Sequence, residues 1–196
     1  MAVTYTQAIA DVIDKLEAGH PLPPLVPEQA WNGGLTDSLE ATTLDALFEG
    51  QTLKNRTFGE AIKSGLLLWN DALDESHTIS QGLTDQTGSY WHGIMHRREP
   101  DYPNAKYWFG RTGAHPIFPA LRTAALDTFN AVSTPSDTLK AIGAAIEAAE
   151  NWDAHRFIDW CEAAAADPDS DASGFLRQIQ AEEIKLLLAY SYKHAV

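Results

Sequence analysis

Residues 91–116 hold an unusual share of the side chains that could do chemistry at neutral pH. The segment contains three of the seven histidines, His92, His96 and His115, and four of the 14 lysines and arginines. Histidine exchanges protons near neutral pH and binds metals, while arginine binds carboxylates and phosphates through a planar fork of donors. We therefore expect a functional site in this segment; a structural network of ion pairs is the alternative.

Two of these histidines have the spacing of a metal-binding pair. His92 and His96 stand at positions i and i+4, which places their side chains one above the other on a helix. Such a pair can hold a divalent cation such as zinc when a third ligand comes from elsewhere. Four residues could supply that ligand: His77, Glu99, Asp101 and His115.

The metal interpretation has an alternative, because the HExxH pattern is absent and Gly93 follows the first histidine. In that alternative, His92 and His96 form the solvated side of an amphipathic helix. The opposite side, which would face the core, consists of Tyr90, Trp91, Ile94 and Met95.

Two prolines predict a bend in the middle of the segment. Pro100 should end the first helix, and Pro103 suits the first turn of the second. The polar faces of both helices then meet at the bend, which brings acids close to imidazoles, as acid–base catalysis requires. The predicted catalytic residues are His92, His96, Glu99, Asp101 and His115.

The second helix presents a polar face opposite Ala105, Trp108 and Phe109. A guanidinium, an amide and a phenol on one face can recognise a carboxylate, a phosphate or a polyhydroxy compound. The predicted substrate-binding residues are Arg97, Asn104, Tyr107 and Arg111. The alternative is a solvated face on which Arg111 pairs with Asp101 or Glu99.

Hydrophobic residues recur at helical spacing along nearly the whole chain, and alternating strand patterns are hard to find. The sequence predicts an all-α fold: a single domain over residues 1–196, with a compact bundle of about seven to nine helices. Residues 20–34 contain four prolines and should form a stiff, extended connection over the surface of the bundle.

Composition excludes several classes of protein. A formal charge of −13 and a pI near 4.8 argue against a nucleic-acid partner, which requires a broad basic surface. The single cysteine, Cys161, excludes an intrachain disulfide and a thiolate metal cluster. The first residues lack the pattern of a secretion signal, and no apolar run is long enough to span a bilayer. We therefore expect a soluble cytoplasmic protein without membrane association.

The stretches Trp91 to Gly93, His96 to Tyr102, Asn104 to Trp108 and His115-Pro116 resemble the signature WHG-x-x-HRREPDY-x-NAKYW…HP. This signature is that of an uncharacterised family of small soluble proteins, and the resemblance implies no particular activity. A fainter similarity, limited to His92, His96 and Arg97, is to the DinB-like metal-binding four-helix bundles. Those bundles continue the helix after the arginine, whereas this chain has Pro100.

Together these features predict a small-molecule enzyme that applies acid–base chemistry to a polar anionic or sugar-like metabolite. The activity would be of the hydrolase or lyase type, with a divalent metal ion such as zinc as cofactor if the histidine pair binds one. The alternative is a non-catalytic small-ligand-binding or interaction module that uses the same face. The sequence leaves the substrate, the reaction and the oligomeric state open.

Overall fold

The computed structural model describes residues 3–196, and this part of the chain forms eleven α-helices and no β-strand. The helices are α1 (Gln7–Gly19), α2 (Gly33–Ala41), α3 (Leu44–Leu47), α4 (Arg56–Trp69), α5 (Leu73–Ser80), α6 (Gln86–Arg98), α7 (Tyr102–Thr112), α8 (Phe118–Asn130), α9 (Asp137–Ala148), α10 (Ala154–Ala164) and α11 (Asp171–Ala195). The all-α prediction is confirmed. The expected number of helices was too low; for example, the backbone is extended at Thr42 and Thr43 caps a new helix, so residues 33–47 form two short helices.

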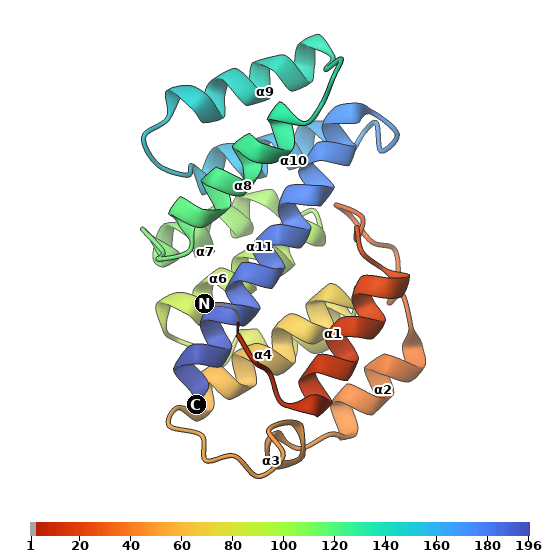
Figure 1. The fold of residues 1–196 in the computed structure, drawn as a ribbon, viewed down its shortest axis with the longest axis vertical. Helices are drawn as coiled ribbons and strands as arrows, with labels where there is room; N and C mark the ends of the chain where they lie inside the picture. Colours follow the sequence, from red (N-terminus) through yellow and green to blue (C-terminus); the bar gives the residue numbers. More distant parts are fainter. Residues whose placement is uncertain (1–2) are drawn as a thin grey trace.

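The longest helix, α11, runs through the middle of the molecule and joins its two ends (Figure 1). It packs on α4 toward one end, beside the N-terminal helices α1 to α3, and on α8, α9 and α10 toward the other. Its buried face includes Leu176, Ile179 and Leu187, which have no exposed surface. This arrangement leaves α5, α6 and α7 as neighbours along one side of α4 and α10.

Helix α6 is buried on all sides, and every residue from Thr87 to Arg98 is covered. It lies against α4 and α5 as well as α7, so no face of it is left to water. The alternative in which His92 and His96 form a solvated side is therefore wrong. Polar groups on a buried helix need partners inside the protein, since an unpaired one costs about 1–3 kcal/mol.

Two arginines at the end of α6 find such partners. The Arg97 guanidinium lies 2.5 Å from a carboxylate oxygen of Glu183, and the Tyr90 hydroxyl donates to the other oxygen at 2.8 Å. Burial alone would lower the pKa of Arg97, but the Glu183 carboxylate more than offsets this and the pKa is raised. The next residue, Arg98, donates to the Leu68 carbonyl and to the Asp71 carboxylate.

The proline-rich segment is held more tightly than its sequence suggested. The carbonyl of Pro24 accepts hydrogen bonds from Arg98 (3.1 Å) and from the side chain of Gln180 (3.1 Å). Pro23 and Leu25 are buried. The segment therefore is part of the packed structure and not only a connection over the surface.

Gly93 permits the close approach of α6 and α7. A Cβ atom at this position would lie 2.8 Å from Cδ2 of Phe109, closer than carbon atoms can pack. We expect Gly93→Ala to lower the free energy of unfolding by about 1–3 kcal/mol, because the ring must move within a packed core. Urea denaturation followed by circular dichroism measures the change.

The matched control for this substitution is Gly110→Ala on α7, where nothing lies within 4 Å of the added Cβ. There the better helix propensity of alanine should stabilise the protein, by up to about 1 kcal/mol. Equal effects of the two substitutions would contradict the tight contact at Gly93.

Among residues 3–196, no helix is both long enough and apolar enough to cross a membrane.

Candidate functional site

Three histidines from two helices come together where α5 packs on the second half of α6. His77 of α5 joins His92 and His96 of α6, and one ring nitrogen of each lies within 4.8 Å of those of the other two. The ring centroids are 4.6 Å apart for His92 and His96, 4.8 Å for His77 and His92, and 5.2 Å for His77 and His96. We call this group the His triad.

His92 is the most buried member of the His triad, with 3% of its surface exposed. Its ring is stacked on that of Trp108 at 4.1 Å and on that of His96 at 4.6 Å. Among residues 3–196, neither Nδ1 nor Nε2 of His92 has a hydrogen-bond partner. Burial, and then the nearby His96 and His77, lower the pKa of His92 to about 4, so its imidazole is neutral at pH 7.

The bend after α6 places a carboxylate and an amide beside His96. Nδ1 of His96 lies 2.7 Å from Oε1 of Glu99, and Nε2 lies 3.1 Å from Nδ2 of Asn104. Asp101 caps α7, because its carboxylate accepts a hydrogen bond from the Asn104 backbone N–H at 3.2 Å. Ligand atoms of His96, Glu99 and Asp101 also lie within 4.8 Å of one another.

The structure thus brings together five of the residues that the sequence singled out: His92, His96, Glu99, Asp101 and Asn104. It adds His77, one of the four residues considered as a third ligand. It also adds Trp108, which sequence analysis had assigned to the packing face of α7. Trp108 follows Asn104 by four residues and so shares its side of the helix, a spacing that could have revealed it.

Arg97 does not join this group. Its guanidinium is buried against Glu183 and stacked over the Phe157 ring at 4.5 Å, where a soluble substrate cannot reach it. The proposed contact between Arg97 and substrate therefore has no support in the geometry. Arg97 instead forms a buried ion pair that links α6 to α11.

The two remaining substrate-binding candidates lie at the surface of α7. Tyr107 is 58% exposed. The Arg111 guanidinium lies over the ring of Trp108 at 5.3 Å. The indole of Trp108 also stacks on His92, so this one ring separates Arg111 from the His triad.

His115 lies apart from the His triad, in the loop between α7 and α8. Its Nε2 is 3.2 Å from the Thr87 hydroxyl, and its Nδ1 accepts from the Ile117 backbone N–H at 3.4 Å. Burial, and then His194, lower the pKa of His115 to about 4. Both ring nitrogens of His115 are within hydrogen-bond distance of nearby groups. The geometry therefore gives no support to a direct catalytic role for His115 at the His triad.

Protonation of His115 should destabilise the folded chain in acid. Its pKa is about 4 in the folded state against an ordinary value of 6.5, so the unfolded chain takes up the proton first as the pH falls. The groups that face it are Thr87, Tyr90, Phe118, Tyr190 and His194. The contribution of the neutral His115 ring to the free energy of unfolding is fully present above pH 6.5. It declines by about 3 kcal/mol in all as the pH falls toward 4.

Denaturant titrations at several pH values test this expectation through their slope. His115→Gln should remove about 1.4 kcal/mol per pH unit from the decline between pH 6.5 and 4. An unchanged slope in this variant would show that His115 is not the group responsible.

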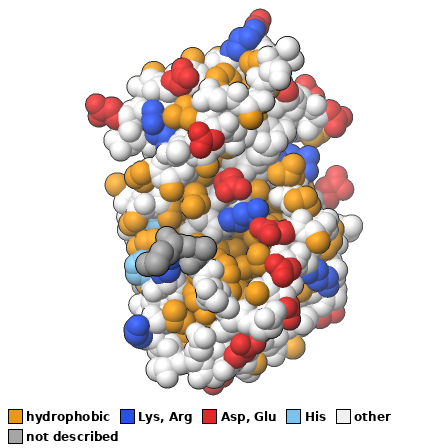
Figure 2. All heavy atoms as spheres, in the orientation of Figure 1, with side chains coloured by type: hydrophobic (Ala, Val, Ile, Leu, Met, Phe, Trp, Pro, Cys, Tyr) orange, Lys and Arg blue, Asp and Glu red, His pale blue; other side chains and the backbone are white. Residues whose placement is uncertain are grey.

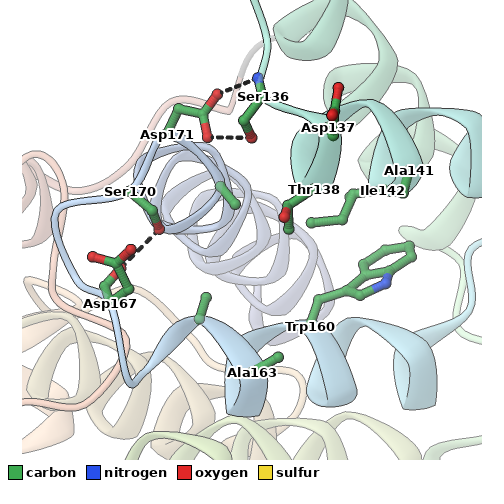
Figure 3. Close-up of a pocket in the computed structure, with 12 residues that line it drawn as sticks. Ser136, Asp137, Thr138, Ala141, Ile142, Trp160, Ala163, Asp167, Ser170 and Asp171 are labelled. Carbon is green, nitrogen blue, oxygen red and sulfur yellow. Dashed lines mark hydrogen bonds between the residues drawn. The ribbon is translucent and has the colours of Figure 1, made fainter.

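Two hollows in the described residues lie away from the His triad. One, of about 790 Å³, lies between α9, α10 and the start of α11, with Trp160 and Ile142 on its walls (Figure 3). There Asp171 accepts hydrogen bonds from the backbone and hydroxyl of Ser136, both at 2.7 Å. We call this hollow the α9–α11 groove. On the face drawn in Figure 2, the basic side chains are scattered among acidic ones and do not gather into a patch.

Comparison with protein-family models, curated proteins and solved structures finds no match to this chain.

Proposed function

We propose that the protein is an enzyme and that its His triad binds a divalent transition metal ion such as zinc. The reaction would be acid–base chemistry of the hydrolase or lyase type on a small anionic or sugar-like metabolite. The observation that carries the proposal is the pair of unpartnered nitrogens on the buried ring of His92, next to two more imidazoles. A metal ion would satisfy a polar group that otherwise costs about 1–3 kcal/mol to bury.

The chemistry of the donors supports a zinc-like ion. Neutral imidazoles are the ligands such ions prefer, and the low pKa of His92 keeps that ring neutral. Zinc ligands at their usual bond length lie about 3.4 Å apart in a tetrahedron. The nitrogens of the His triad lie within 4.8 Å, so modest side-chain rotations would bring them to a shared ion.

Glu99 is proposed as the residue that orients His96. A carboxylate bonded to one nitrogen of an imidazole fixes the ring and strengthens the other nitrogen as a ligand. Glu99 stands in that relation to Nδ1 of His96, so the metal would bind Nε2 and would displace the Asn104 amide that lies 3.1 Å from it. Asn104 faces that nitrogen, and Arg111 at the surface would hold the anionic part of a substrate.

One observation favours the second candidate in its form as a non-catalytic interaction module, in which the metal would be structural. His92 and His96 are only 3% and 5% exposed, and Trp108 covers His92. Catalytic zinc sites keep a coordination position open, whereas structural sites are closed. The distinction is therefore whether a small molecule can reach the metal.

Cobalt(II) substitution tests both candidates, because the visible spectrum of cobalt reports its ligands. The proposal expects a tetrahedral cobalt spectrum that changes when acetate or inorganic phosphate is added, since an open position accepts an anion. A spectrum that ignores both anions would favour the non-catalytic module. The absence of protein-bound cobalt would overturn the metal site itself, and His155→Ala, on the exposed side of α10, is the control that should leave the spectrum unchanged.

A further inference from the structure

The α9–α11 groove has the size and the walls of a binding site for a small molecule. Its volume of about 790 Å³ is in the range of pockets that hold small organic ligands. No residue of the His triad lies on its walls, so a function here is independent of the one proposed above.

One side of the groove is apolar. The partly buried indole of Trp160 and the side chain of Ile142 lie on this side, and Ala163 of α10 lies next to them (Figure 3). Because the alanine side chain is short, it leaves open the space beside the indole. This side can therefore contact the aromatic or aliphatic part of a ligand.

Acidic residues lie on the other side, where α11 begins (Figure 3). Asp167 and Asp171 flank Ser170, the cap of α11, and the Asp167 side chain is exposed to solvent. The Asp171 carboxylate accepts two hydrogen bonds from Ser136, which lower its pKa and keep it charged. A carboxylate has about four acceptor positions, so Asp171 can also accept hydrogen bonds from a ligand.

The charges around the groove favour a cation over an anion. The starts of α9 and α11 each carry about half a positive charge, but each has an acid in its first turn, Asp137 and Asp171. Asp167 adds a full negative charge, and among the described residues that line the groove none is basic. Lys140 lies outside the groove wall and pairs with Asp137 at 2.9 Å. The second hollow, of about 830 Å³ at the end of α7, has one acid on its walls, Asp153, so this concentration of acids is particular to the α9–α11 groove.

We propose that the α9–α11 groove binds a small organic ammonium ion with an aromatic or aliphatic body. The ammonium group donates to the carboxylates of Asp167 and Asp171, while the body packs against Trp160 and Ile142. Such a ligand matches the negative charge of one side of the groove and the apolar surface of the other.

Phenethylamine, which is cationic at neutral pH, is a suitable probe, with phenethyl alcohol and phenylacetate as its neutral and anionic counterparts. NMR titration of the ¹⁵N-labelled full chain should show saturable binding of the amine, weaker binding of the alcohol and the weakest binding of phenylacetate. The Trp160 indole signal should move on addition of the amine, because the indole contacts its aromatic ring.

Two variants and a matched control complete the test. Asp167→Asn should weaken binding of the amine about two- to fivefold, as expected for the loss of one exposed ion pair. Asp169→Asn, in the same loop, removes the same charge but is not on the groove wall, and should leave the affinity nearly unchanged. Ala163→Leu, at an exposed position of α10, fills the groove and should weaken binding about tenfold or more.

The proposal is overturned if the amine does not bind, or if phenylacetate binds as tightly as the amine. It is also overturned if Asp169→Asn weakens binding as much as Asp167→Asn, or if Ala163→Leu binds the amine as tightly as the wild type.

Discussion

Replacing Glu183 with glutamine is expected to lower the free energy of unfolding by about 3–5 kcal/mol. The substitution leaves the Arg97 guanidinium buried without its counter-charge and weakens the acceptor for the Tyr90 hydroxyl. Burying one charge without its partner costs far more free energy than replacing both charged residues by apolar ones, because no water can solvate the unpaired charge.

Urea denaturation measures this loss, with Glu182→Gln on the neighbouring, partly exposed position as the control. The control should change stability by less than about 0.5 kcal/mol. Because Glu183→Gln could prevent folding altogether, the double variant Arg97→Met/Glu183→Leu provides a second test. Removing both charges should cost much less than removing one, and a double variant as unstable as the single one would contradict the pairing.

Replacing His92 with leucine should have opposite effects in the absence and presence of metal. Without metal, leucine removes two unpartnered buried nitrogens and should stabilise the chain by about 1–3 kcal/mol. With zinc at 100 times its dissociation constant, the wild type should gain about 2.7 kcal/mol and the variant nothing.

Thermal denaturation with EDTA and with zinc separates these two effects. His155→Leu, at an exposed position outside the His triad, should behave like the wild type in both conditions. If zinc stabilises the His92→Leu variant as much as the wild type, His92 is not a ligand.

The bend and its neighbours could be predicted from local sequence, because Pro100 and Pro103 act on their own residues. Helix α6 ends at Arg98 and α7 begins at Tyr102, as the prolines indicated. The proximity of His92, His96, Glu99 and Asn104 follows from helical periodicity and this bend.

The burial of α6 could not be read from its own residues. Seven of its thirteen residues, Gln86, Thr87, Ser89, His92, His96, Arg97 and Arg98, are polar, a composition that favours a solvated face. Their burial depends on partners far along the chain, such as Glu183 for Arg97 and Asp71 for Arg98. The same holds for His77, which only the packing of α5 on α6 brings to the site.

A metal centre at the His triad can be measured as the zinc content of protein purified without a histidine tag. After reconstitution with zinc and removal of the excess, we expect close to one ion per wild-type chain and almost none in His92→Leu or His77→Ala. Exposed His155→Ala should retain the ion. A wild-type chain that holds no zinc, or a His77→Ala/His92→Leu double variant that holds as much as the wild type, would contradict a metal centre at the His triad.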